Sequence, residues 1–247
     1  IKTGRNSYTA HVIDPRCMVC WYRGGMTELT LAVGEESLRN DYKGCHRGAQ
    51  APDISMGVLN YSLTRTQPKP ASKQLNPDYW FNYARPMVWM SYAETQFLLA
   101  EAALRGYQGA SLTGTAEDYY RCGVKASMDY YEIPSDVVAS YITGLVALND
   151  GTFTSGNKEK MLEAIITQKW LAVFPNGNEG WAEFRRTDYP ALANQLTNNS
   201  GGDVPIGKMI KRLLYPNSEV TNQYFKSHFE LQRKNTQGTR LWWDVAD

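Results

Sequence analysis

The chain has 247 residues, with 26 lysines and arginines against 25 aspartates and glutamates, and a hydrophobic fraction of 43%. The net charge of +1 gives no electrostatic reason to expect nucleic acid or an anionic membrane surface as a partner, and the hydrophobic content argues against a disordered chain. No apolar run approaches the roughly 18 residues that a membrane-spanning helix needs.

Residues 1–86 show no sustained hydrophobic period and contain frequent glycines and prolines, including the pair Gly24-Gly25. Gly-Gly and X-Pro pairs interrupt regular structure, so this segment is predicted to consist of long loops with short strands. A loop-rich stretch of this length is unusual unless the loops have a function or pack on another surface.

Three of the four cysteines lie in this first segment. Cys17 and Cys20 form a C-x-x-C pair and Cys45 precedes His46, so three thiolates and an imidazole could surround zinc. A zinc ribbon normally carries a second C-x-x-C, which is missing here. The preferred interpretation is therefore that these cysteines form a disulfide or remain as buried thiols and bind no metal ion. If the protein is exported to an oxidising compartment, a disulfide between Cys45 and either Cys17 or Cys20 is plausible.

The hydrophobic period becomes helical from residue 87. Ser91 and Glu94 match the S-x-x-E capping box that begins a helix, and Gly106 matches the glycine that ends one. The apolar residues of one face are spaced 3-4-3-4: Met90, Ala93, Phe97, Ala100 and Leu104.

A second helix is predicted to begin at Thr115 and Asp118 and to run to about residue 131. Its predicted apolar stripe consists of Tyr119, Cys122, Ala126 and Tyr130. Because only a short loop with glycines joins the two helices, they are expected to form an antiparallel pair.

Further helices are predicted along the rest of the chain. A short one begins at Ser135 and ends near Gly144, and a polar, glycine-rich loop follows over 143–157. The next is marked by Leu162, Ile165, Ile166, Trp170 and Val173 and ends at Pro175. Two more are expected over 179–187 and 218–232. These elements predict a mainly α fold of tetratricopeptide-like antiparallel helix pairs, although no strict 34-residue repeat is visible.

The sequence carries none of the common catalytic signatures: no H-E-x-x-H, no G-x-S-x-G and no G-x-x-x-x-G-K. Glu94 and Glu101 lie two helical turns apart, which could serve a two-carboxylate glycosidase. The preferred interpretation is a capping acid at Glu94 and an ion pair of Glu101 with Arg105. Arg185 and Arg186 could clamp an anion, but ion pairs between packed helices are the preferred role.

Five phrases of the sequence belong together: residues 91–106 (SYAETQFLLAEAALRG), 168–170 (QKW), 180–190 (GWAEFRRTDYP), 215–222 (YPNSEVTN) and 241–244 (LWWD). In this order they resemble the C-terminal half of the SusD/RagB family of nutrient-binding lipoproteins, in its starch-binding, outer-membrane-associated subfamily. The resemblance extends from about Asp14 to Asp244. It is specific because the order and the separations of the phrases all agree.

The resemblance implies that the helices near 87–131 and 158–187 are later pairs of a tetratricopeptide-like scaffold. The stretch 204–214 is longer than the family's usual link, and the family is about twice as long as this chain. Residues 1–247 are therefore expected to form a single SusD-like region of a larger protein, with 1–86 ligand-facing and 87–247 the scaffold. The residues with implied structural roles are Trp181, Arg185, Arg186, Tyr189, Pro190, Tyr215, Pro216 and Asn222.

The resemblance also implies a function: a non-catalytic lid without a cofactor, on the outward face of the outer membrane of Bacteroidetes. It would bind a glycan and pass it to a SusC-like TonB-dependent transporter, held by an N-terminal lipid anchor that this chain does not carry. A peptide-binding lid, a glycoside-active enzyme and a helical-repeat protein that binds another protein are the alternatives.

Flat aromatic rings with polar neighbours suit sugar binding, because sugar rings present apolar faces and rims of hydroxyls. Rings in the non-periodic segment are the best candidates, since rings inside an apolar stripe are committed to the core. The predicted ligand-binding residues are Trp21, Tyr22, Arg23, Tyr79, Trp80 and Asn82.

Overall fold

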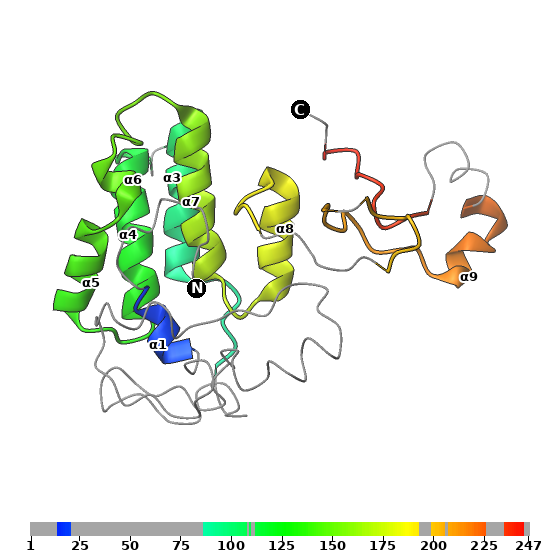
Figure 1. Ribbon diagram of the computed structural model, residues 1–247, viewed down its shortest axis with the longest axis horizontal. Helices are drawn as coiled ribbons and strands as arrows, with labels where there is room; N and C mark the ends of the chain where they lie inside the picture. Colours follow the sequence, from blue (N-terminus) through cyan, green and yellow to red (C-terminus); the bar gives the residue numbers. More distant parts are fainter. Residues whose placement is uncertain are drawn as a thin grey trace. The chain divides into compact units, whose positions relative to one another are not determined.

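The computed structural model describes residues 14–20, 86–107, 109, 112–192, 199–205, 207–225 and 235–244. These residues fall into two compact units, one that runs to Ala191 and one that begins at Leu192. Figure 1 shows the helices of both units. The six residues predicted to bind ligand, and Cys45 and His46, lie outside the described residues.

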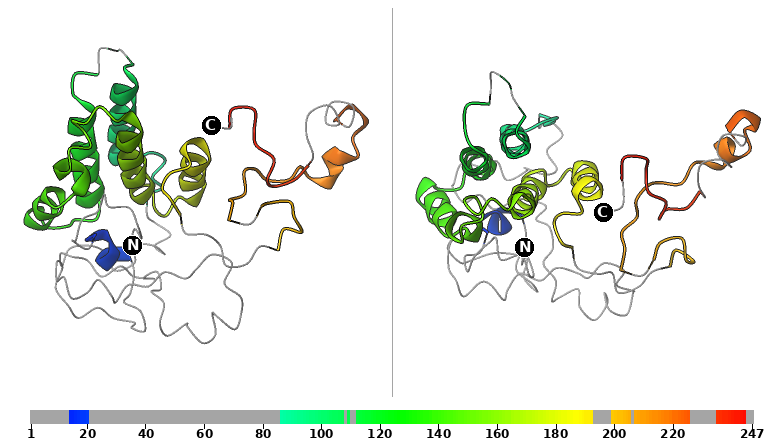
Figure 2. Two further views of the ribbon diagram at one scale, coloured as in Figure 1. Left: turned by 45° about the horizontal axis from the view of Figure 1, so that its top comes forward. Right: turned by 90° about the horizontal axis from the view of Figure 1, so that it is seen from above.

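The first unit is built from helices, of which α3, α4 and α7 stand side by side (Figures 1 and 2). No strand occurs in the described ranges, and none of the helices there is long and apolar enough to cross a membrane. The mainly α prediction is confirmed. In chain order the helices of this unit are α1 (Arg16–Cys20), α3 (Tyr92–Arg105), α4 (Ala116–Asp129), α5 (Ser135–Thr143), α6 (Val146–Asn149), α7 (Lys158–Ala172) and α8 (Gly177–Thr187).

The two predicted helix starts are confirmed. Ser91 precedes α3, and its hydroxyl accepts the backbone N–H of Glu94 at 3.1 Å. Gly106 ends this helix in the left-handed conformation, with φ of 76°. Before α4, Thr115 and Asp118 form a complete capping box, in which each side chain accepts the other residue's backbone N–H.

The buried face of α4 is not the predicted one. Cys122 and Tyr130 are exposed, and Tyr119 and Ala126 are only partly buried. Both candidate stripes have helical spacing, so the period could not decide between them. Close packing on α3 decides, because a Cβ at Gly123 would lie 2.8 Å from the Phe97 ring. The residues of α4 that face the core are Tyr120, Gly123, Val124, Ser127 and Met128.

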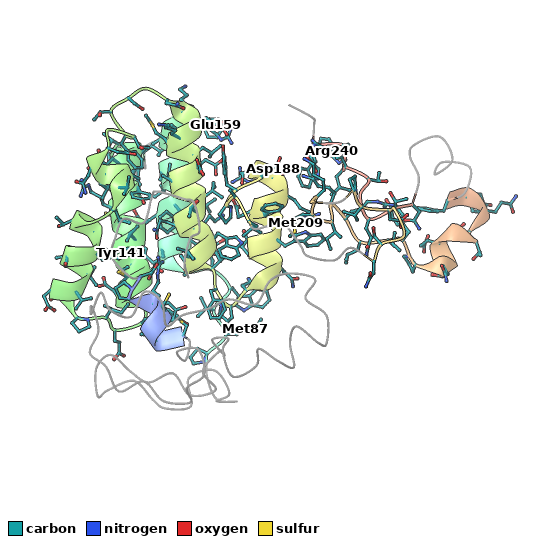
Figure 3. All side chains as sticks on the ribbon, viewed as in Figure 1. Met87, Tyr141, Glu159, Asp188, Met209 and Arg240 are labelled. Atoms are coloured by element: carbon teal, nitrogen blue, oxygen red, sulfur yellow. The ribbon has the colours of Figure 1, made fainter. Side chains whose placement is uncertain are left out.

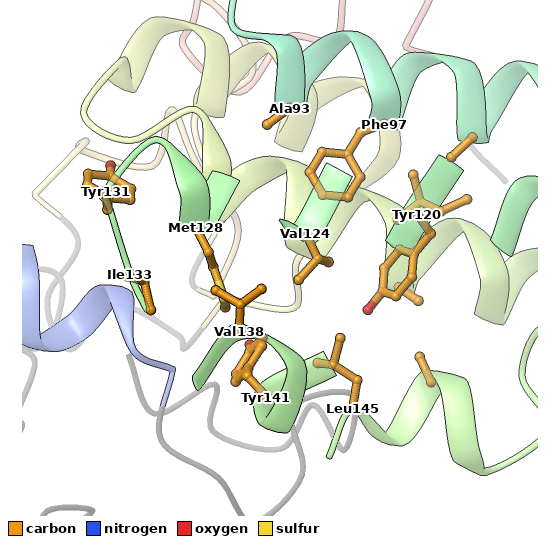
Figure 4. Close-up of a cluster of buried hydrophobic side chains, with 14 of the residues drawn as sticks. Ala93, Phe97, Tyr120, Val124, Met128, Tyr131, Ile133, Val138, Tyr141 and Leu145 are labelled. Atoms are coloured by element: carbon orange, nitrogen blue, oxygen red, sulfur yellow. The ribbon is translucent and has the colours of Figure 1, made fainter. Parts of the chain in front are cut away.

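Figure 4 shows the core that forms between α3, α4 and α5. The Phe97 ring meets Tyr120 edge-on, with 6.2 Å between ring centroids. On α3, Ala93, Phe97 and Ala100 are buried as predicted, whereas Met90 is exposed because it precedes the helix. Val138, Tyr141 and Leu145 close the core from α5 and the residues after it.

Helix α7 is the central helix of the unit, since it packs against α3, α4 and α8. Six consecutive residues, from Ala164 to Lys169, are buried, so the helix has no solvent-facing side there. Of the predicted apolar positions, Ile165, Ile166 and Val173 are buried and the other two are partly buried. The polar residues Gln168 and Lys169 must therefore find partners inside the unit.

Two boundaries differ from the predictions. The expected loop over 143–157 contains the short helix α6, because Leu145 and Ala147 are buried and hold this turn against α5. Helix α8 begins at Gly177, two residues earlier than predicted, because the Asn176 side chain accepts the backbone N–H of Glu179 and caps the helix.

The second unit is small and is held by polar contacts. The carboxylate of Asp244 pairs with Lys211 at 3.2 Å and with Arg240 at 3.3 Å. The side-chain oxygen of Asn235 accepts hydrogen bonds from Arg212 at 2.6 Å and from the Tyr215 backbone at 3.1 Å. The contact with Asn235 agrees with the structural role that the resemblance implied for Tyr215.

The predicted single helix over 218–232 is interrupted near its start. Helix α9 (Asn217–Val220) is followed by a turn, and residues 223–225 are helical again. Asn222 causes the restart, because its side-chain oxygen accepts the backbone N–H of Tyr224 at 3.0 Å. Residues 226–232 lie outside the described residues.

Candidate functional site

A cleft of about 1330 Å³ lies at one end of the first unit. Its walls come from the strip before α3, the end of α4, the end of α7 and the start of α8. Because α4 and α7 run antiparallel to α3, the start of α3 and the ends of the other two meet at the same end of the bundle (Figures 1 and 2). Met87 marks this end in Figure 3.

Aromatic and apolar side chains stand exposed on the wall formed by residues 86–92. The Trp89 side chain is 85% exposed and that of Tyr92 is 68% exposed, while Tyr130 faces the cleft from the end of α4 with 39% exposed. Met87, Val88 and Met90 extend the same surface. Binding sites characteristically have several large apolar side chains exposed around one concavity, whereas single exposed apolar residues are common elsewhere on protein surfaces.

Polar side chains also line the cleft. Lys125 and Asp129 form an ion pair of 2.6 Å on α4. Glu94, Glu179 and the amides of Asn176 and Asn178 face the same space. The described lining residues therefore include one cationic and three anionic side chains.

Behind Glu94 lies the ammonium of Lys169, which is only 1% exposed. It meets Glu183 at 2.7 Å, Glu179 at 3.6 Å and Glu94 at 3.9 Å. Burial raises the pKa of Glu94, and the like charges of Glu179 and Glu183 add to the rise, although Lys169 opposes it. The wall at Glu94 therefore already disfavours negative charge.

The predicted ion pairs between helices are confirmed at Arg186 and Glu101. The Arg186 guanidinium on α8 donates two 2.6 Å hydrogen bonds to Glu101 on α3, and a 2.7 Å bond to Glu183. Arg105 pairs with Glu101 at 2.8 Å, as the i,i+4 spacing predicted. Burial alone would raise the pKa of Glu101, but the two arginines hold it below its usual range.

This pairing also bears on the two-carboxylate alternative. Glu101 is fully engaged by two guanidinium groups, and Glu94 lies beside the ammonium of Lys169.

Two further contacts involve the segment 181–190. Arg185 stacks on Trp181 at 3.9 Å from the ring centroid, and the Tyr189 hydroxyl donates to Glu159 at 2.7 Å. These contacts agree with the structural roles that the resemblance implied for 181–190.

A buried network holds α1 against the wall of the cleft. Arg16 forms a two-pronged pair with Asp14, whose shortest distance is 2.6 Å. The same guanidinium donates to Ser127 on α4 at 2.9 Å and to Gln168 on α7 at 2.7 Å, and the Tyr141 hydroxyl donates to Asp14 at 3.1 Å. Figure 3 marks the place of Tyr141 beside α1.

Cys17 and Cys20 lie on α1 and are both buried, and burial raises the pKa of both thiols. Among the described residues, no three His, Cys, Asp or Glu side chains are grouped so as to hold a metal ion. The Cys45 bridge considered from the sequence involves a residue outside the described ranges.

None of the described residues that line the cleft was predicted to bind ligand. Tyr130 fits the apolar stripe predicted for the second helix, and Trp89 lies just before the predicted helix start at Ser91. The available signal was the apolar run Met87-Val-Trp-Met90 directly before Ser91, which no helical face of α3 can bury.

Comparisons with known proteins agree with the fold. The model of the SusD-like family described as "starch-binding associating with outer membrane" matches residues 9–216. A chitin-binding SusD homologue from Flavobacterium johnsoniae is 27% identical, with a TM-score of 0.66, over 95% of this chain and 47% of its own. SusD homologues from Bacteroides vulgatus and Bacteroides uniformis are 29% and 30% identical, with TM-scores of 0.66 and 0.65.

The alignment with the Bacteroides vulgatus homologue covers 94% of this chain and 46% of that one, and the alignment with the Bacteroides uniformis homologue covers 83% and 44%. The chain thus spans about half the length of the solved structures that it matches. The comparison with curated proteins gave no match.

Proposed function

This chain belongs to the SusD-like family of starch-binding proteins that associate with the outer membrane, and from this premise we propose that it binds nutrient glycans without cleaving them. The protein would act at the outward face of the outer membrane, held there by a lipid anchor, and would deliver the glycan to a SusC-like TonB-dependent transporter. The observation that carries the proposal is the family match over most of the chain.

The chemistry of the described residues supports a binding role. Sugar rings have apolar faces that stack on aromatic side chains, and hydroxyl rims that exchange hydrogen bonds with amides and carboxylates. Both kinds of group line the cleft. Glu94 and Glu101, the two carboxylates that could have suggested a glycosidase, are held in ion pairs.

The six residues chosen from the sequence remain proposed ligand contacts. In the sequence, Trp21, Tyr22 and Arg23 are consecutive, and Tyr79, Trp80 and Asn82 lie within four positions. If they contribute, Trp21→Ala and Trp80→Ala should each weaken glycan binding. Starch and chitin fragments are the first glycans to test, because the matched family and one solved relative are described by these polymers.

The experiment is affinity electrophoresis of the protein through gels that contain starch, glycol chitin or other nutrient polysaccharides, followed by analysis of the polymer for new reducing ends. Retardation without new reducing ends is the expected result. New reducing ends would establish an enzyme. Retardation by no glycan, together with co-purification of a TonB-dependent channel with bound peptide, would favour the peptide-binding alternative.

A further inference from the structure

The described residues that line the cleft between the 86–92 strip and the α7–α8 turn include more negative than positive side chains. We propose that this cleft binds a neutral glycan chain and excludes acidic ones, such as polymers of uronic acids or sulfated sugars. The inference rests on the proposed function, and it adds a place and a ligand class to it.

The size of the cleft fits a chain of several sugar units. Sites for single small molecules usually enclose about 300–1,000 Å³, and this cleft exceeds that range at about 1330 Å³. Trp89 lies before α3 and Tyr130 directly follows α4, and both border the same space, so the two rings can contact different units of one sugar chain.

Exposure of the rings supplies the driving force. The Trp89 side chain is 85% exposed, so almost all of its apolar surface can be covered by a ligand. Burial of such surface contributes roughly 25 cal/mol per Å². The amides of Asn176 and Asn178 also line the cleft, and they can both donate and accept the hydrogen bonds that sugar hydroxyls require.

The charges of the cleft disfavour an anion. Among the described lining residues, Lys125 is the single cation, and its ammonium already meets Asp129 at 2.6 Å. Glu94 and Glu179 line the same space. The described lining residues therefore have a net charge of −2, from one positive and three negative side chains.

The described cation behind this wall is Lys169, which is buried. It meets Glu183 at 2.7 Å, Glu179 at 3.6 Å and Glu94 at 3.9 Å, so its single charge is shared among three carboxylates. The pKa of Glu94 is raised because burial and the neighbouring carboxylates penalise a negative charge at this position. A uronate or sulfate in the cleft would meet this penalty, whereas a neutral sugar would not.

The test is titration calorimetry of the whole protein with neutral oligosaccharides of chitin and starch, and with acidic oligosaccharides of polygalacturonate and alginate. We expect measurable binding of a neutral ligand and at least tenfold weaker binding of both acidic ones. Trp89→Ala should weaken the neutral binding about tenfold or more. The matched control is Trp242→Ala, because Trp242 is 87% exposed but lies outside the cleft, and this variant should bind as the wild type does.

A separate variant tests the contribution of the charges. Replacement of two lining carboxylates, as in Asp129→Asn with Glu179→Gln, should raise affinity for the acidic oligosaccharides relative to affinity for the neutral ones. If Trp89→Ala does not fold by circular dichroism, Tyr92→Ala replaces it with the same expectation, since that ring is also largely exposed.

The outcomes separate the two proposals. Neutral binding that survives both Trp89→Ala and Tyr92→Ala, or acidic ligands that bind as tightly as neutral ones, would overturn the inference and leave the proposed function intact. Absence of binding to every glycan would overturn the proposed function, and the inference with it.

Discussion

Arg16 and Gln168 lie 152 positions apart in the sequence and are joined by a buried hydrogen bond of 2.7 Å. The same guanidinium pairs with Asp14 and donates to Ser127, so a single side chain fastens α1 to α4 and α7. A buried charge needs such partners, because transfer of an unpaired ion out of water costs several kcal/mol. The first unit should therefore depend strongly on this residue.

Arg16→Met should lower the free energy of unfolding by about 3–5 kcal/mol, because it leaves the carboxylate of Asp14 buried without a cation. Urea denaturation followed by circular dichroism measures the change. Arg121→Met is the matched control, since Arg121 forms an exposed i,i+4 pair with Glu117 and its loss should cost less than about 0.5 kcal/mol. Similar effects in the two variants would contradict the role given to Arg16.

Stability should fall as the pH drops below about 4.5. The pKa of Asp14 is pulled below its usual value, because the charge and hydrogen bonds of Arg16 outweigh the opposing effect of burial, and that of Glu101 is lowered by Arg186 and Arg105. A carboxylate with a depressed pKa adds stability above its unfolded pKa and loses it as the pH falls through its folded pKa. Unfolding free energies measured from pH 7 to pH 3 should show this decline, and Glu101→Gln should make it shallower.

Glu94 and Glu101 lie two turns apart on α3, and neutralising each of them should affect the stability of the protein differently. Glu101→Gln should cost about 1–3 kcal/mol at pH 7, because it leaves two arginines without their shared carboxylate. Glu94→Gln should leave stability unchanged or increase it, because burial and like charges already disfavour its ionised form. Thermal unfolding of the two variants at pH 7 makes the comparison, and a larger loss for Glu94→Gln would refute the assignment.

Gly123→Ala should destabilise the α3–α4 pair by about 1–3 kcal/mol, because the added methyl would meet the Phe97 ring at 2.8 Å. Gly177→Ala is the control in another helix, where nothing lies within 4 Å of the added carbon. Alanine also favours a helix, so the control variant should be neutral or slightly more stable. Chemical denaturation of both proteins gives the difference.

Features that depend on a few neighbouring residues were predictable from the sequence. The caps at Ser91 and Thr115, the stop at Gly106 and the pair of Glu101 with Arg105 all follow from local spacing. The buried face of α4 was not predictable, because two stripes one residue apart share the same period and only the contact of Gly123 with Phe97 distinguishes them.

The site was harder to predict than the scaffold. The cleft brings together Trp89 before α3, Tyr130 after α4 and Asn176 before α8, and no local spacing in the sequence shows that these residues meet. The sequence predicted that Arg186 forms an ion pair between helices, but it did not identify Glu101 as the partner, because the two residues lie 85 positions apart. Long-range contacts of this sort are fixed by packing, not by a motif.

The most direct test of the central claim, glycan binding without cleavage, is titration calorimetry of the whole protein with neutral chitin and starch oligosaccharides. Each titrated sample is then chromatographed to determine the length of the recovered sugar. Saturable binding of at least one of these oligosaccharides, recovered at its original length, is the predicted result. Shortened oligosaccharides, or no heat of binding with any of them, would contradict the account.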